Sequence, residues 1–230
     1  MYTRETERKD TAVQVVYCRL PTETEWRERE RFAFTMNEWL QPMREYRRWQ
    51  DRCRFWIGRK LLAYLLTPTY AHFNLNNIRY TNYGRPYIEH CCDFNISHSG
   101  DFVIASVTKN GRIGIDIEQI KDVCIDDFIE ILSPDQLNVI KKDEEPTSMF
   151  YRIWTMQESV VKLLGSGISV PLQNILSDFT TARIYNRTYY LKELDIDKKY
   201  SLYLATDRIV SSLSLKELKF KQVTTLPVIL

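Results

Sequence analysis

Residues 94–118 read FNISHSGDFVIASVTKNGRIGIDIE, and this stretch decides the fold that we expect for the chain. It divides into β-rich runs at 94–97, 102–108 and 112–118. The dipeptide Asn110-Gly111 separates the last two runs, and Asn-Gly in this position is the strongest short-range hairpin signal. We therefore expect the second and third strands to pair with each other.

The segments around this stretch combine helices with further strands. An apolar stripe at helical spacing ends at Thr67-Pro68, and Gly165 closes the clearest helix of the second half. The expected helices are 23–40, 44–66, 127–141 with a fresh start at Ser133-Pro134, and 148–164. The other expected strands are 188–194, 200–205 and 215–220, with a YGRP turn between 78–80 and 87–88. This mixed order predicts an α+β fold rather than a doubly wound sheet.

The composition limits the class of protein. The chain has 230 residues and 27.4 kDa, which suits one large domain or two small halves. No apolar run approaches the roughly 18 residues that span a bilayer, and the charged start MYTRETERKD lacks the apolar region of a secretory signal. The cysteine count of five is odd and there is no CxxC pair, which argues against a disulfide framework or a zinc site. We expect a cytoplasmic protein that does not contact membranes.

Charge is distributed unevenly, although the formal net charge is only +2. Residues 44–60 contain seven basic and two acidic residues, whereas residues 116–145 contain ten acidic residues and three lysines. Such blocks are commonly solvated helix faces, but they could also bind a polyanion on one side and a metal or basic partner on the other. Nucleic acid is a poor candidate, because the pI near 8.2 is low and no RNP, KH or zinc-finger pattern occurs.

The run RIGIDIE is a candidate metal site. Alternation sends its isoleucines to one face and Gly114, Asp116 and Glu118 to the other. The two carboxylates, about 6.8 Å apart along the strand, can converge on one hard cation, and Gly114 leaves room for a ligand. The same pattern also suits a strand with a solvated face, so this run alone identifies no site.

Two further elements are ambiguous when taken alone. Trp154, Glu158 and Lys162 share one helix face, but Glu and Lys four residues apart are also a common exposed pair. His98 lies at a strand end before Gly100 and is suited to donate hydrogen bonds to phosphate, although a lone histidine is more often structural. The GxSxG and HExxH motifs are both absent.

In combination, order and spacing of these motifs resemble the Sfp-type (surfactin-synthetase-activating) family of 4′-phosphopantetheinyl transferases. The matching pieces are YGRP at 83–86, FNISHSGDFV at 94–103, IGIDIE at 113–118 and FYRIWTMQESVVKLLGSGIS at 150–169. The resemblance extends from about Arg54 to about Pro171. Several motifs in the right order are far more specific than any one of them. This combination favours a functional site over a solvated strand face, an exposed Glu–Lys pair and a structural histidine.

The resemblance implies a pseudo-symmetric α+β protein of two similar α/β halves, residues 1–109 and 110–230, with the ligand cleft between them. Such enzymes move the 4′-phosphopantetheine arm of coenzyme A onto a serine of an acyl or peptidyl carrier protein and release 3′,5′-ADP. Mg²⁺ is the expected metal, and Mn²⁺ is left open. We expect a monomer whose halves form a pseudo-dimer. The carrier, from fatty acid, polyketide or nonribosomal peptide synthesis, is not specified.

The family's metal ligands match Asp116, Glu118 and Glu158 in the second half, which would hold Mg²⁺ against the pyrophosphate of coenzyme A. Lys162 would stabilise or protonate the leaving phosphate. Glu158 would accept the carrier serine's proton, directly or through a water. Which carboxylate is the base stays open, and Asp116, Glu158 and Lys162 are the expected catalytic residues.

The resemblance also implies the coenzyme A contacts. His98 and Ser97 match the family's contacts to its phosphate end, and Arg54 matches an arginine that binds the 3′-phosphate region. Arg85 replaces the lysine often seen in a YGKP turn and is expected near the adenine. Lys162 completes the expected set.

Two departures leave alternatives open. Gln157 stands where the family's helix motif usually has lysine, and Ser159 where alanine is common, so we expect reduced charge near the site. A catalytically attenuated module that binds coenzyme A or carrier protein is the first alternative, and the retained carboxylates argue against it. A metal-dependent phosphohydrolase is the second, and it would need a water nucleophile and more acidic ligands.

Overall fold

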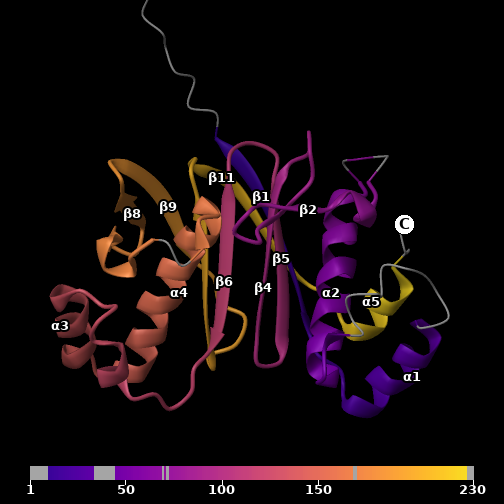
Figure 1. The fold of residues 1–230 in the computed structure, drawn as a ribbon, viewed down its shortest axis with the longest axis horizontal. Helices are drawn as coiled ribbons and strands as arrows, with labels where there is room; N and C mark the ends of the chain where they lie inside the picture. The colour runs from indigo at the N-terminus through magenta and orange to yellow at the C-terminus, as the bar shows by residue number, and fades with distance from the viewer. Residues whose placement is uncertain (1–9, 34–44, 69, 71–72, 168–169, 227–230) are drawn as a thin grey trace, which may run out of the picture.

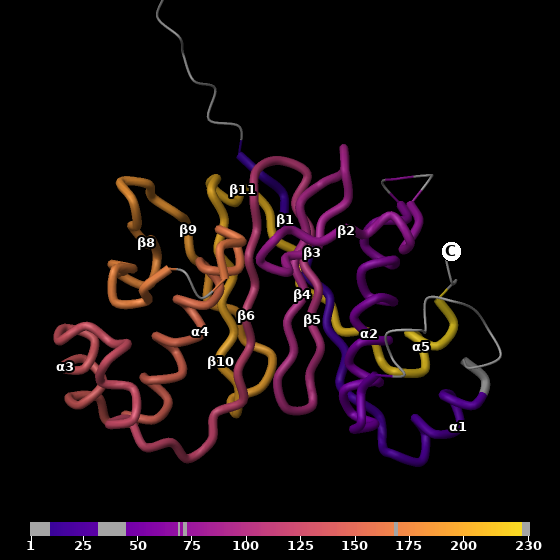
Figure 2. The backbone as a smooth tube through the Cα atoms, viewed as in Figure 1, coloured from indigo at the N-terminus to yellow at the C-terminus, as the bar shows by residue number. Residues whose placement is uncertain are grey.

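The fold consists of two main β-sheets and two long helices that cover their outer faces (Figures 1 and 2). The computed structural model describes residues 10–33, 45–68, 70, 73–167 and 170–226. The strands are β1 (Thr11–Arg19), β2 (Arg79–Tyr80), β3 (Pro86–Tyr87), β4 (Asp93–Ser99), β5 (Phe102–Thr108), β6 (Ile113–Gln119), β7 (Leu176–Ser177), β8 (Thr181–Ile184), β9 (Arg187–Glu193), β10 (Tyr200–Thr206) and β11 (Val210–Glu217). The helices are α1 (Glu23–Ala33), α2 (Trp49–Leu66), α3 (Pro134–Lys142), α4 (Pro146–Leu164) and α5 (Phe220–Thr225), with 3₁₀ turns at Leu75–Asn77, Ile125–Phe128 and Leu172–Asn174.

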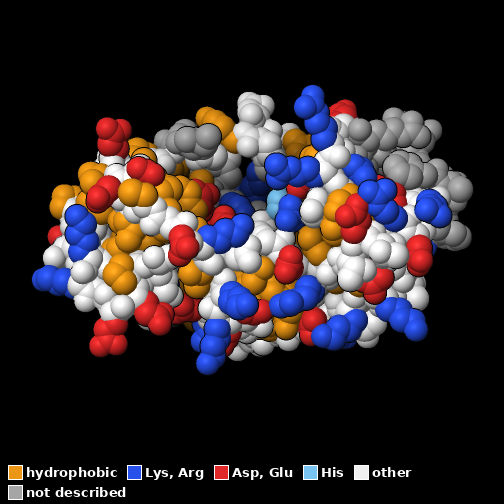
Figure 3. Space-filling model, turned by 90° about the horizontal axis from the view of Figure 1, so that it is seen from below, with side chains coloured by type: hydrophobic (Ala, Val, Ile, Leu, Met, Phe, Trp, Pro, Cys, Tyr) orange, Lys and Arg blue, Asp and Glu red, His pale blue; other side chains and the backbone are white. Residues whose placement is uncertain are grey.

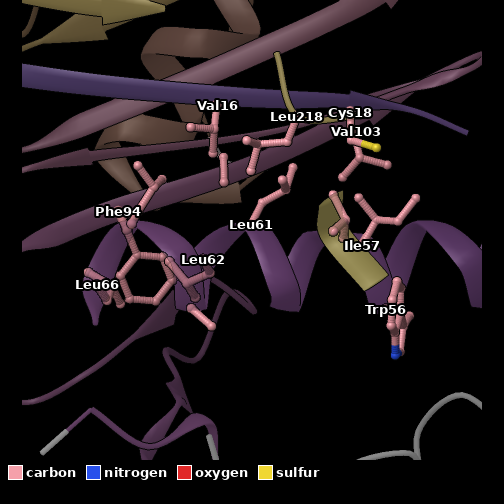
Figure 4. Packing of buried hydrophobic residues seen from close by; sticks show 14 of the residues in the cluster. Val16, Cys18, Trp56, Ile57, Leu61, Leu62, Leu66, Phe94, Val103 and Leu218 are labelled. Atoms are coloured by element: carbon pink, nitrogen blue, oxygen red, sulfur yellow. The ribbon is translucent and has the colours of Figure 1, made fainter. Parts of the chain in front are cut away.

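These elements form the α+β fold that the sequence predicts. The first sheet has the order β11-β1-β5-β4 and the second has the order β6-β10-β9-β8-β7. Residues of β1, β5, β6 and β10 share one hydrophobic core, so the two sheets face each other. The other face of the first sheet packs on α2, as Figure 4 shows, and the other face of the second sheet packs on α4. The layers are therefore α2, first sheet, second sheet and α4.

Most predicted helices and strands are confirmed, with shifted ends. α1 begins at residue 23 as predicted, but residues 34–40 lie outside the described residues, as does Arg44. α2 begins at Trp49, later than predicted, and the strand expected at 215–220 is misplaced because β11 ends at Glu217. α4 ends as predicted at Gly165, which adopts the left-handed conformation. Within the described part of the chain, no helix is long and apolar enough to cross a membrane.

The predicted hairpin at Asn110-Gly111 is wrong. The chain does turn there, with Gly111 at φ 82°, but β5 and β6 belong to different sheets. Both edges of β5 are occupied: β4 pairs with it across the turn at Gly100, and β1 pairs with it on the other side. β6 therefore pairs with β10. The Asn-Gly signal correctly indicates a turn, but the strands that already pair with β5 determine which sheet β6 joins.

The two ends of the described chain meet in the first sheet. β1, which the sequence analysis did not predict, pairs antiparallel with β5 and parallel with β11. Val13 and Val15 point into the core between the sheets, and Val16 and Cys18 point toward α2. The division into residues 1–109 and 110–230 stays a prediction, and one strand of the second part lies in the sheet of the first.

Three of the five cysteines are small side chains packed in the core. Cys18, Cys53 and Cys92 are buried, Cys91 is half-buried and Cys124 is exposed. Burial raises the pKa of Cys18 and of Cys92 to about 12, so both thiols stay protonated near neutral pH. Their place is in the packing of α2 against the first sheet.

Lys60 is a buried cation in the α2 layer. Its side chain is 1% exposed, its Nζ donates a hydrogen bond to the Leu226 carbonyl (2.6 Å), and the ammonium lies 5.3 Å from the Trp56 ring centroid. Burial, together with the charge of Arg29, lowers the pKa of Lys60 to about 8. A group whose pKa falls on folding destabilises the folded state while it is protonated, and the penalty fades as pH rises above the folded-state pKa.

Lys60→Met is therefore expected to be more stable than the unmodified chain at pH 7. The difference should shrink by about 2 kcal/mol between pH 7 and pH 9.5, because only the folded chain loses its Lys60 proton there. Urea unfolding of both proteins across this range measures the difference, and Lys198→Met, at an exposed side chain, is the control. A difference that stays constant with pH would contradict the lowered pKa.

Candidate active site

Side chains of β4 form a hydrogen-bond ladder with the backbone of β6, and this side-chain ladder sets the geometry of the site. Alternate residues of β4 accept hydrogen bonds from alternate N–H groups of β6. The bonds join Asp93 Oδ2 to Ile113 N (2.8 Å), Asn95 Oδ1 to Ile115 N (3.1 Å), Ser97 Oγ to Ile117 N (3.3 Å) and Ser99 Oγ to Gln119 N (3.0 Å). The two strands run side by side in Figure 1, one from each sheet. The ladder therefore fixes which β6 residues stand beside Ser97 and His98.

Asp116 lies where β4, β6 and α4 meet. As predicted, the isoleucines of β6 enter the core between the sheets, and Asp116, 3% exposed, points to the α4 side. Its Oδ1 accepts hydrogen bonds from Ser97 Oγ (3.0 Å) and from Lys162 Nζ (2.5 Å). Lys162 Nζ also donates to Ser97 Oγ (2.7 Å). Three predicted site residues from three elements are thus in direct contact.

Two more carboxylates border the same pocket, named here the carboxylate pocket. It has a volume of about 260 Å³ and is lined by Ile96, Ser97, His98, Asp116, Glu118, Trp154, Glu158 and Lys162. Burial raises the pKa of Glu118, an effect that its hydrogen bond with Ser99 opposes. Burial also raises the pKa of Glu158, and the Asp116 carboxylate adds to the rise. Asp116, Glu118, Glu158 and Lys162, which the family resemblance assigns to one site, therefore line one pocket.

The chemistry of this pocket fits a hard divalent cation. Carboxylate oxygens are the ligands that Mg²⁺ prefers, with waters and phosphate oxygens completing its coordination. Asp116 Oδ2 is buried without a hydrogen-bond partner, and such an orphaned acceptor is costly unless a ligand satisfies it. Within the described residues, no three His, Cys, Asp or Glu side chains are already gathered as ligands of one ion. The two glutamates are the side chains able to complete a site with Asp116.

A second pocket, the basic pocket, lies on the α2 side of His98. It measures about 330 Å³ and is lined by Tyr46, Asp51, Arg54, Phe55, Gly58, Arg59, Pro86, Ile96 and His98. Arg54 donates to Asp51 Oδ1 (2.8 Å) and to the Gly100 carbonyl (2.6 Å), which orients it toward the β4–β5 turn. In Figure 3, a histidine and several Lys or Arg side chains border a hollow near the middle of one face. Arg54 and His98 thus line the same pocket, and Arg59 is a lining residue that was not among the expected site residues.

Most of the basic block lies elsewhere. Arg47 and Arg48 are exposed, as the alternative of a solvated helix face predicts. Arg52 forms an ion pair with Glu30 (2.5 Å) on α1. The position of a basic residue in the sequence therefore says little about its function. Of the block's arginines that the structure describes, Arg54 and Arg59 line the basic pocket.

A third and larger cavity, about 680 Å³, adjoins both pockets. It shares Trp154, Glu158 and Lys162 with the carboxylate pocket and Pro86 with the basic pocket, and Ile96 lines all three spaces. Its other walls come from the YGRP turn, from Glu130 and Ile131, and from Gly165, Gly167 and residues 170–173 beyond α4. The three spaces together form a continuous recess around Ile96, large enough for a ligand of the size of a nucleotide.

Arg85 borders this cavity, but its guanidinium is engaged with protein acceptors. It donates to Asp93 Oδ2 (2.6 Å) and to the carbonyls of Leu163 (2.6 Å) and Ile113 (2.9 Å). Burial lowers the pKa of Arg85 and raises that of Asp93, while the attraction between the two charges opposes both shifts. Arg85 therefore ties the end of α4 to β4 and β6. Its predicted contact with coenzyme A stays a prediction.

Breaking this pair is expected to be costly. Arg85→Met should lower the free energy of unfolding by about 3 kcal/mol, because it leaves the Asp93 charge buried without its partner. The exposed pair of Arg79 with Glu89 is the matched control, and Arg79→Met should cost less than about 1 kcal/mol. Chemical denaturation of both variants measures the two costs. Equal losses would show that Arg85 is not a structural clamp.

Two expectations about the site are corrected. Gly114 does not leave room for a ligand: an added Cβ would lie 2.0 Å from the Ser159 carbonyl oxygen, because α4 crosses β6 at this point. Gln157 does not face the carboxylates. It is fully buried and donates to the Leu172 carbonyl (2.7 Å), so the change from lysine falls outside the carboxylate pocket.

The chain is similar to known proteins of one family. The model of the 4′-phosphopantetheinyl transferase superfamily matches residues 112–213. The chain is 33% identical over 170 residues to a 4′-phosphopantetheinyl transferase of Bacillus subtilis, covering 66% of this chain and 73% of the relative. It is also 33% identical over 154 residues to 4′-phosphopantetheinyl transferase Sfp of Bacillus subtilis strain 168, covering 64% and 68%. A holo-[acyl-carrier-protein] synthase of Thermotoga maritima matches more loosely, with TM-score 0.33 and 13% identity over 43% of this chain and 63% of that chain.

Proposed function

The chain belongs to the Sfp-type 4′-phosphopantetheinyl transferases, and from this membership we propose the reaction that it catalyses and the residues that carry it. The enzyme transfers the 4′-phosphopantetheine arm of coenzyme A to a serine hydroxyl of an acyl or peptidyl carrier protein. The other product is 3′,5′-ADP, and the reaction depends on Mg²⁺. The observation that supports this assignment most directly is the convergence of Asp116, Glu118, Glu158 and Lys162 on one pocket.

In the proposed reaction, the carrier serine oxygen bonds to the phosphorus that bears pantetheine. The bond from that phosphorus to the bridging oxygen breaks, and 3′,5′-ADP leaves with the electron pair. Glu158 accepts the serine proton, directly or through a water, and the burial that raises its pKa makes it a stronger base than an exposed glutamate. Lys162 stabilises or protonates the departing phosphate from the position where Asp116 and Ser97 hold its ammonium.

Asp116, Glu118 and Glu158 would hold the metal. A bound Mg²⁺ offsets the negative charge that develops on the leaving phosphate. Lys162 already neutralises part of the Asp116 charge, so the three carboxylates and one lysine leave a net negative pocket for a divalent cation. The unsatisfied Asp116 Oδ2 supports this use.

Coenzyme A would lie in the recess around Ile96. Arg54, with Arg59 beside it, and His98 would bind the phosphate of the ribose in the basic pocket, and Ser97 and Lys162 would contact the pyrophosphate. Arg85, which lines the large cavity, would lie near the adenine. In this proposal the recess between the α2 layer and the α4 layer is the cleft between two pseudo-symmetric halves of a monomer.

An assay with and without carrier protein tests this function against its alternatives. The protein is incubated with coenzyme A, Mg²⁺ and each of several apo carriers, and the intact mass of the carrier is recorded. A gain of one phosphopantetheine arm on a carrier supports the transferase. Binding of coenzyme A without transfer to any carrier would favour the attenuated binding module, and release of 3′,5′-ADP without carrier would favour a phosphohydrolase.

A further inference from the structure

Ser99 has no part in the reaction described so far, yet it contacts one of the proposed metal ligands. It is the last residue of β4, and its Oγ donates a hydrogen bond to Glu118 Oε2 (2.7 Å). The same oxygen accepts a hydrogen bond from the Gln119 N–H (3.0 Å). The hydroxyl thus connects the Glu118 carboxylate to the backbone of the residue that follows it.

Ser97 makes the same arrangement one step along the side-chain ladder. Its Oγ donates to Asp116 and accepts from the Ile117 N–H. Each serine therefore bridges a β6 carboxylate and the next N–H group of β6. The repeat spans two residues on each strand, which is the period of side chains on one face of a strand.

The residue types along the side-chain ladder follow the charges of β6. Where β6 carries Asp116 and Glu118, the acceptor on β4 is a hydroxyl, which can turn its proton toward a carboxylate. The other two acceptors are Asp93 and Asn95, and the residues in the corresponding places are Arg112, directly before β6, and Gly114. A carboxylate at position 99 would satisfy the Gln119 N–H equally well but would repel Glu118. A hydroxyl meets both requirements with one group.

We propose that Ser99 is a positioning residue for the metal site, acting through Glu118. It restricts the rotamer of a half-buried glutamate by holding Oε2, in a side chain that lines the carboxylate pocket. A fixed carboxylate loses less conformational freedom when it binds a cation than a mobile one. This inference rests on the proposed function, because it takes Glu118 as a metal ligand.

Mn²⁺ binding measured by electron paramagnetic resonance, with coenzyme A present, tests the proposal without relying on turnover. Ser99→Ala should weaken Mn²⁺ binding by about tenfold or more, in line with the loss of a hydrogen bond that orients a metal ligand. Ser99→Thr keeps the hydroxyl and should restore binding. Ser106→Ala is the matched control, since Ser106 is equally a strand serine, is fully buried, and donates only to the Asn95 carbonyl. Its Mn²⁺ binding should match that of the unmodified protein.

A double substitution shows whether Ser99 acts through Glu118. In the Glu118→Ala background, Ser99→Ala should cause no further loss of Mn²⁺ affinity, because the group that it orients is gone. Affinity for coenzyme A without metal should be the same in Ser99→Ala and the unmodified protein. If Ser99→Ala does not fold, Ser99→Cys replaces it, since a thiol is a weak donor of similar size.

The outcomes separate this inference from the proposed function. Unaltered Mn²⁺ affinity in Ser99→Ala, or an equal loss in the Glu118→Ala background, would overturn the role of Ser99 and leave the transferase assignment intact. Failure of the unmodified protein to bind Mn²⁺ in the presence of coenzyme A would instead overturn the metal site, and the role of Ser99 with it.

Discussion

Asp116→Ala is expected to reduce phosphopantetheine transfer by about a thousandfold or more, the scale of losing a group that stabilises charge in the transition state. Asp116 contacts Ser97 and Lys162 and keeps one oxygen without a partner, so its removal affects the cation and the lysine together. Coenzyme A should still bind, at reduced strength, because the basic pocket is untouched. Transfer is measured by carrier mass, and coenzyme A binding by calorimetry.

Asp195→Ala is the matched control for this change. Asp195 is an exposed aspartate beyond the end of β9, and its removal should leave transfer unchanged. Full transfer by Asp116→Ala, with the control equally active, would contradict the assignment of Asp116 as a metal ligand. Transfer that is lost together with all coenzyme A binding would instead indicate that the recess has collapsed, which a thermal melt detects.

Gly114→Ala is expected to have the largest effect on stability. The added Cβ would lie 2.0 Å from the Ser159 carbonyl oxygen and 2.5 Å from the Leu163 nitrogen, both in the backbone of α4. Neither atom can move without displacing the helix from the second sheet, so we expect a loss of more than about 3 kcal/mol. The same displacement would move Glu158 and Lys162 away from Asp116.

Gly84→Ala is the control that separates a clash from backbone strain. Gly84 has φ 79°, in the left-handed region, and an added Cβ would meet nothing within 4 Å. Its substitution should cost only about 1 kcal/mol, the penalty of that conformation. Urea unfolding gives both values, and a Gly114→Ala cost no greater than that of Gly84→Ala would contradict the close crossing of α4 over β6.

Local periodicity was sufficient to predict the faces of the site-bearing elements. Alternation along β6 separates the isoleucines from Asp116, and helical spacing places Trp154, Glu158 and Lys162 on one face of α4. Both patterns depend only on the geometry of a single element. The sequence could therefore indicate which side chains share a face, and the family resemblance indicated that the two faces belong to one site.

Contacts between distant segments could not be predicted in this way. The pairing of β6 with β10 rather than β5, and the addition of β11 to the first sheet, depend on which strand edges other segments have already occupied. Arg85 was expected near the adenine of coenzyme A, but the acceptors of its guanidinium hydrogen bonds are protein atoms on β4, β6 and α4. The link from Ser99 to Glu118 appears only once β4 and β6 are in register.

The most direct test of the account is the dependence of transfer on the divalent cation. An apo carrier that the protein modifies is incubated with coenzyme A and the protein after removal of metal by a chelator, and the intact carrier mass is recorded before and after Mg²⁺ is restored. We expect no gain of mass without metal, and a gain of one phosphopantetheine arm on the carrier serine when Mg²⁺ is added. Equal transfer under both conditions would contradict a site built on Asp116, Glu118 and Glu158.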